Sequence, residues 1–75
     1  MKISDLQDKT IININNGKNV GKISDLDIDE SGKVICFYVM PKRLFFNFFV
    51  VDKEISFTIN DIKKIGEDVI LVQLN

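Results

Sequence analysis

The side chains best suited to chemistry in this chain are three aspartates at alternate positions, Asp25, Asp27 and Asp29. This spacing matches the first three acidic ligands of a calcium-binding loop. The match then fails, because the sixth position is Glu30 instead of the turn-forming glycine and the twelfth is Cys36 instead of a bidentate glutamate. Apolar residues separate the acids, which is typical of a strand with a solvated polar face. We therefore expect no metal site and no cofactor.

Few other groups could support catalysis. The chain has no histidine, the side chain most often used as a base or metal ligand near neutral pH. Its one cysteine, Cys36, is flanked by Ile35 and Phe37, and no second thiol, acid or base stands near it in sequence to activate it. Cys36 is therefore expected to pack as an inert apolar residue. No catalytic residues are identified, and we do not expect an enzyme.

Length and charge narrow the class of protein. The chain has 75 residues, enough for one domain over 1–75, and a domain of this size buries only about 60% of its extended-chain surface. Association with a second chain is therefore expected. The formal charge of −1 gives no general attraction to nucleic acid or to anionic lipid. The lone cysteine, a start without a long apolar run and the absence of a membrane-length apolar segment predict a cytoplasmic protein.

A β-hairpin is predicted near the start of the chain. Residues 10–14 are rich in β-branched side chains, and Asn15, Asn16 and Gly17 follow before apolar residues resume at Val20. Asparagine and glycine tolerate the positive φ that tight hairpin turns require. Residues 10–14 should therefore pair with the strand that begins near Val20.

The apolar face of this second strand changes sides partway along. Gly21 and Ile23 share one parity, whereas Leu26 and Ile28 share the other. A bulge or sharp bend around Ser24 and Asp25 would absorb this change, with Gly21 permitting the bend. The Asp25 carboxylate is expected to accept hydrogen bonds from backbone groups that the bulge frees.

The next strand has apolar residues on both faces. A turn at residues 29–33, with Gly32 in the left-handed position, leads into residues 34–40, and Pro41 ends the strand. One face should cover the core, and the other should contact a lid, a loop or a second subunit.

The last third of the chain predicts two more strands and one helical turn. Residues 54–59 alternate, with Ile55, Phe57 and Ile59 expected inward. A short helical turn near 60–65 should tuck Ile62 and Ile65 under the barrel, and Gly66 should turn the chain into a final strand at 69–74. Together these elements predict an all-β fold, a small strongly curved barrel of about five or six short strands.

A cluster of aromatic residues follows Pro41 and forms the candidate partner-binding surface. One strand face cannot bury all of them: half of the rings could fold back onto the core, or the exposed remainder could form a protein contact. With the outer face of residues 34–40, this predicts a homodimer. Lys42 and Arg43 superficially resemble a nucleic-acid patch but are more typical of a solvated loop edge. The candidate partner-binding residues are Tyr38, Phe45, Phe46, Phe48 and Phe49.

Three segments together resemble the PRC-barrel domain family, and in particular its YlmC/YmxH sporulation type. They read GKNVGKISDLDID, EISFTINDIKKIGEDVILV and MKISDLQDKTIININNG, and they cover nearly the whole chain. The resemblance implies a small β-barrel without catalytic residues. It also implies a protein-docking role, as in the H subunit of purple bacterial photosynthetic reaction centres and in the ribosome maturation factor RimM.

The resemblance leaves two functions open. The sporulation type implies a self-associating, cytoplasmic interaction module with a sporulation-associated role. The RimM barrel implies the alternative of a ribosome- or RNA-associated factor.

Overall fold

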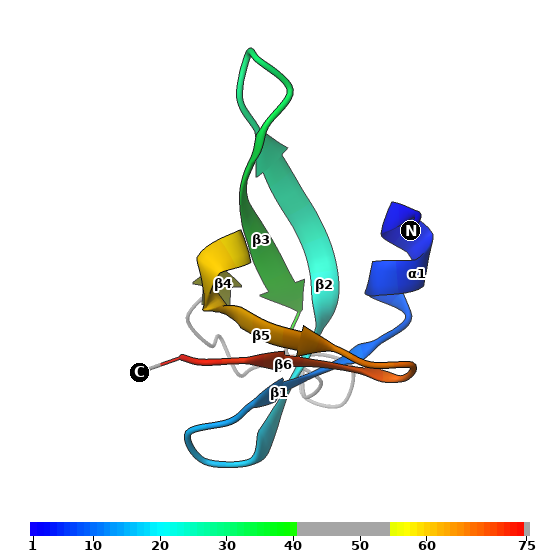
Figure 1. Cartoon of the computed structure of the whole chain (residues 1–75), viewed down its shortest axis with the longest axis vertical. Coiled ribbons are helices and arrows are strands. Elements are labelled where there is room, and N and C mark those ends of the chain that lie inside the picture. Colours follow the sequence, from blue (N-terminus) through cyan, green and yellow to red (C-terminus); the bar gives the residue numbers. More distant parts are fainter. Residues whose placement is uncertain (41–54, 75) are drawn as a thin grey trace, which may run out of the picture.

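The structure is a computed structural model, and it describes residues 1–40 and 55–74. In these residues six strands form one sheet in the order β4-β3-β2-β1-β6-β5 (Figure 1). The all-β class is therefore confirmed, with six short strands, and the sheet is strongly bent but not closed within the described residues. The elements are α1 (Ile3–Gln7), β1 (Thr10–Asn13), β2 (Lys18–Ile28), β3 (Val34–Met40), β4 (Ile55–Phe57), the 3-10 turn η2 (Ile59–Asp61), β5 (Ile62–Ile65) and β6 (Val69–Val72).

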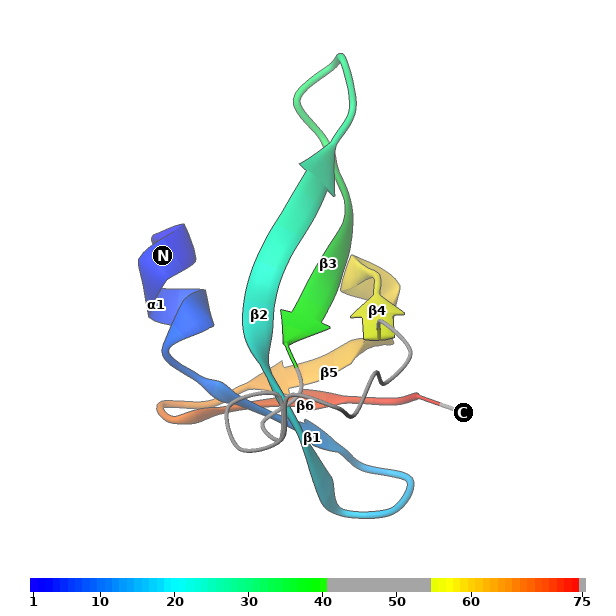
Figure 2. The ribbon, with the colours of Figure 1, turned by 180° about the vertical axis from the view of Figure 1, so that it is seen from behind.

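The longest strand, β2, takes part in both halves of the sheet. Its first half pairs with β1 as the predicted hairpin, and its second half pairs with β3. The β2–β3 hairpin rises away from β1, β5 and β6, which lie across its base (Figures 1 and 2). The bend coincides with a bulge, because Ile23 pairs with Val39 and Asp25 pairs with Tyr38, which leaves Ser24 as an extra residue. The predicted change of face is confirmed at this position.

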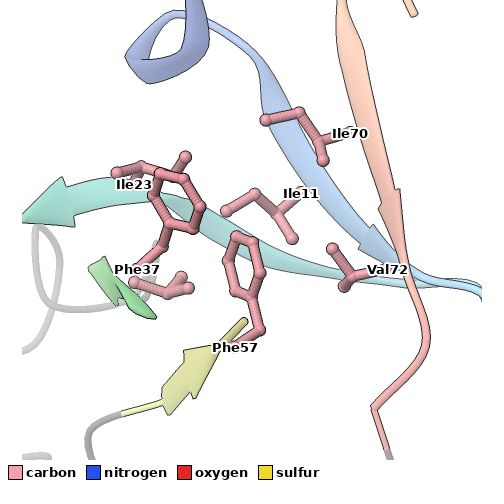
Figure 3. Packing of buried hydrophobic residues seen from close by; sticks show 7 residues of the cluster. Ile11, Ile23, Phe37, Phe57, Ile70 and Val72 are labelled. Carbon is pink, nitrogen blue, oxygen red and sulfur yellow. The ribbon is translucent and has the colours of Figure 1, made fainter. Parts of the chain in front are cut away.

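The core lies where the two halves of the sheet face each other. Figure 3 shows side chains from β1, β2, β3, β4 and β6 pointing toward one another. The rings of Phe37 and Phe57 stack with their centroids 5.3 Å apart. Within the described residues seven hydrophobic side chains are buried. They are Ile11, Ile23, Phe37, Val39, Phe57, Ile70 and Val72.

A parallel pairing of β1 with β6 completes the lower half of the sheet. Thr10 lies opposite Val69, although 58 residues separate the two in sequence. Asn13 fastens the end of this pair, because its buried side-chain oxygen accepts hydrogen bonds from the backbone N–H groups of Asn15 at 3.1 Å and Leu74 at 3.2 Å. A buried amide satisfied in this way specifies the register of both strands.

Two sequence predictions about the last third of the chain are wrong in detail. The helical turn occupies Ile59–Asp61 rather than residues 60–65, and the segment after it is strand β5. Ile62 packs against the core, but Ile59 and Ile65 are exposed rather than buried. The long-range pairing of β5 with β6 replaces the helical turn, and a bulge beside Ile62 places Ile65 opposite the buried Ile70. Ile65 is nevertheless 40% exposed, because it is the last residue of β5, which lies at the edge of the sheet.

Ile28 also departs from its expected place on the buried face. Leu26 packs against the core as the change of face requires, but Ile28 is 58% exposed. Ile28 is the last residue of β2, and the β2–β3 hairpin extends beyond the core at that point (Figure 2). Its exposure is one of the features from which the candidate site is built below.

The described residues also contain a short helix, α1, that the sequence did not predict. The backbone N–H of Lys2 donates a 2.8 Å hydrogen bond to the carboxylate of Asp5, which begins the helix. None of the helices in the described residues has the length and apolar character that crossing a membrane requires.

Candidate interaction surface

The aromatic residues predicted to bind a partner, Phe45, Phe46, Phe48 and Phe49, lie outside the described residues. The fifth, Tyr38, lies on the outer face of β3, where it pairs with Asp25 of β2 on one side and with Ser56 of β4 on the other. The candidate surface is therefore built here from the β2–β3 hairpin and the elements that flank it.

A hydrogen-bonded cluster joins β2 and β3 on the outer face of the hairpin. The Tyr38 hydroxyl donates to Oδ2 of Asp27, and the Cys36 thiol donates to the same oxygen at 3.8 Å. Because the neutral phenol is the donor, the hydrogen bond to Asp27 raises the pKa of Tyr38 well above its ordinary value of 10.0, and the hydrogen bond with Cys36 adds to the rise. The cluster holds the two strands together and keeps the phenol protonated.

This cluster brings together one carboxylate, one thiol and one phenol. Within residues 1–40 and 55–74, no three carboxylate, thiol or imidazole side chains converge as metal ligands. The three aspartates that suggested a calcium loop have separate roles. Asp25 accepts a 2.9 Å hydrogen bond from the backbone N–H of Leu26 beside the bulge, and Asp27 accepts from Tyr38.

The sequence pattern suggested that Asp29 belongs to the polar face of a strand, and this prediction is wrong. Asp29 lies just beyond β2, where its Oδ1 accepts hydrogen bonds from the Ser31 N–H at 2.9 Å, the Ser31 hydroxyl at 2.7 Å and the Lys33 N–H at 2.9 Å. These bonds, led by the Ser31 hydroxyl, lower the pKa of Asp29. The carboxylate organises the β2–β3 turn as an Asx motif and stays ionised.

Gly21 has a specific steric reason to be glycine. It adopts φ +122° at the point where the end of β3 crosses closest to β2. A β-carbon there would overlap the carbonyl oxygen of Met40 and lie 3.0 Å from the carbonyl carbon. Gly17 and Gly32 take φ values of +70° and +88° in the two hairpin turns, and Gly66 lies in the turn between β5 and β6.

An apolar hollow of about 540 Å3 opens between the β2–β3 hairpin and η2. Val34 and Ile35 approach it from β3, and Ile59 approaches it from η2, which lies beside β3 in both views (Figures 1 and 2). Ile35 is 52% exposed and Ile59 is 54% exposed. We call these residues, with Asp29 and Lys33, the hairpin groove.

A second bulge turns Ile35 toward this groove. Asp27 pairs with Cys36 and Ile28 pairs with Val34, so Ile35 is the extra residue between the two pairs. Directly paired residues project from the same face of a sheet, so Ile28 lies on the same face as Val34. The sequence reasoning missed this groove, although apolar residues on both parities of β3 were a signal that a second apolar surface exists.

Comparisons with known proteins agree with this architecture. The family model described as "PRC-barrel domain" matches residues 1–75. The chain is 38% identical over 76 residues to "Probable sporulation protein YlmC" of Bacillus subtilis, a match that covers 100% of this chain and 94% of that protein. It is 34% identical over 70 residues to an uncharacterized protein of Clostridium acetobutylicum, with 93% of this chain and 80% of that protein covered. With a bent six-stranded sheet and a family match that spans its whole length, the chain belongs to the PRC-barrel domain family.

Proposed function

We propose that this protein is a non-enzymatic protein-interaction module that forms a homodimer in the cytosol and has a sporulation-associated role. One observation carries the interaction role: Ile35 and Ile59, each more than half exposed, line one apolar groove. Isolated exposed apolar residues are normal on a protein surface, but a concave cluster of them is typical of an association site.

The length of the chain supports self-association. A domain of this length gains about 3–5 kcal/mol from one core, so further apolar burial against a second chain would add substantially to its stability.

The sporulation-associated part of the proposal has a different support. It comes from similarity to a relative named as a probable sporulation protein, which this chain matches along its whole length. The cytosolic part is supported by the single cysteine, Cys36, since a lone thiol is typical of a reducing compartment.

A pull-down from native cytosol, combined with light scattering of the purified protein, tests this function. We expect a dimer at micromolar concentration and captured proteins that stay bound as salt rises from 0.1 to about 0.5 M, because apolar contacts are weakly screened. Bound material that is lost steeply with salt and removed by ribonuclease would favour the alternative of an RNA-associated factor. If no protein is captured and the light scattering gives a monomer, the interaction module is wrong.

A further inference from the structure

We infer that the hairpin groove is the contact between two copies of this chain, related by a two-fold axis, with Asp29 of each copy facing Lys33 of the other. This inference rests on the proposed self-association and adds the surface and its symmetry. Three properties of the groove lead to it: its exposed isoleucines, the charges at its rim and its position on the fold.

The floor of the groove supplies the apolar contact. Ile35 of β3 and Ile59 of η2 line one hollow, and both are more than half exposed. An apolar side chain inserted into the hollow would contact both of them, and the exposed Ile28 pairs with Val34, which also lines it. Insertion of an apolar side chain into such a pocket is the usual centre of a protein interface.

The rim of the groove carries one anion and one cation. Asp29 uses only its Oδ1 for the turn, and within the described residues its Oδ2 accepts no hydrogen bond. Lys33 is exposed, and its side chain has no ion pair or hydrogen-bond partner in the part of the chain that the structure describes. The rim of the groove thus presents the Oδ2 of Asp29 and the ammonium group of Lys33, each without a side-chain partner among the described residues.

These charges select a second copy over other occupants. In a two-fold interface residue i of one copy contacts residue j of the other and the reverse, so one Asp29 and one Lys33 per copy form two complementary pairs. An acidic peptide in the groove would face Asp29, and a basic peptide would face Lys33, so each would have one repulsive contact. Only a partner with the same pattern in reverse satisfies both charges, and the chain itself has that pattern.

The position of the hairpin makes it accessible to a second copy. The β2–β3 turn is the part of the described fold farthest from β1, β5 and β6 (Figure 1).

The test is the dimer dissociation constant, measured by sedimentation equilibrium for matched variants. Ile35→Lys places a charge in the groove, and we expect at least a tenfold weaker dimer. Ile14→Lys is the control, because Ile14 is 44% exposed and lies beyond the end of β1, away from the groove. Its dissociation constant should equal that of the wild type.

A second pair of variants tests the charges without touching the apolar floor. Lys33→Glu makes both rim contacts repulsive and should weaken the dimer at low salt, with the effect shrinking as salt rises. Lys33→Arg keeps the charge and should retain the wild-type constant. Lys33 is exposed in the turn, so these variants stay informative if Ile35→Lys proves unable to fold, which circular dichroism would reveal.

The outcomes separate this inference from the proposed function. A wild-type dimer that Ile35→Lys and Lys33→Glu leave unchanged would overturn the hairpin groove as its contact, while the interaction module would stand. Equal weakening by Ile14→Lys would also overturn it, because the effect would not be specific to the groove. A wild-type monomer would overturn both the groove contact and the homodimer, and the pull-down would then decide the interaction module alone.

Discussion

Replacement of Gly21 by alanine should be one of the most damaging single-methyl changes in this protein. Two effects combine, since φ +122° costs an L-residue about 1–3 kcal/mol and the new β-carbon overlaps the backbone carbonyl of Met40. Relief of such an overlap by backbone shifts costs about 1–3 kcal/mol more. A chain of 75 residues has a total stability of roughly 4–11 kcal/mol, so the variant should lose at least about 2 kcal/mol, a large part of it.

Thermal and urea unfolding followed by circular dichroism measure this loss. At about 4–8 °C per kcal/mol, the midpoint of Gly21→Ala should fall by about 8 °C or more, or cooperative unfolding should disappear. Gly17→Ala is the matched control, because φ is also positive there but nothing lies within 4 Å of the added β-carbon. It should lose only about 1 kcal/mol. Equal losses for the two variants would show that the close approach of β3 to Gly21 does not exist.

Three further predictions concern single side chains. Tyr38 is the only tyrosine, so ultraviolet titration should show that it ionises well above pH 10.0 in the wild type and nearer pH 10.0 in Asp27→Asn. The stability that this hydrogen bond contributes is present below the ordinary pKa of tyrosine. It is lost as the pH rises through the pKa of Tyr38 in the folded protein. An unchanged titration in Asp27→Asn would contradict the cluster. For Asp29 the sign is opposite: carboxyl NMR should give a pKa below 3.8, so its contribution is present above that value and is lost as pH falls through the folded pKa. Asn13→Ala should lower the free energy of unfolding, measured in urea, by about 1–3 kcal/mol, because two backbone N–H groups lose their acceptor. The control Asn16→Ala, at an exposed turn position, should lower it much less.

Local signals in the sequence were sufficient for the two hairpins of residues 10–40, although not for the short helix α1. The turn at Gly17, the change of face at Ser24 and the strand Val34–Met40 depend on neighbouring residues, and the structure has all three. Alternating patterns report which face is buried, and the alternation of residues 54–59 correctly predicted that Phe57 is buried.

The errors arose where long-range pairing decides the outcome. Ile62 and Ile65 are three residues apart, a spacing that suits a helical turn, but their backbone pairs with β6 instead. The parallel contact between β1 and β6 has no local signature at all. The hairpin groove was missed for the same reason, since it forms only when η2 lies beside β3 and exposes Ile59 there.

The place of β6 in the sheet has a consequence for synthesis of the chain. Residues 69–72 are translated after the other five described strands. Nevertheless, β6 lies between β1 and β5 in the sheet and supplies the buried Ile70 and Val72. Until these residues leave the ribosome, Ile11 has no neighbour on that side and one edge of β1 is unpaired. The nascent chain should therefore stay partly unfolded and sensitive to proteases or chaperones until β6 emerges, and the lower half of the sheet should then form in one late step.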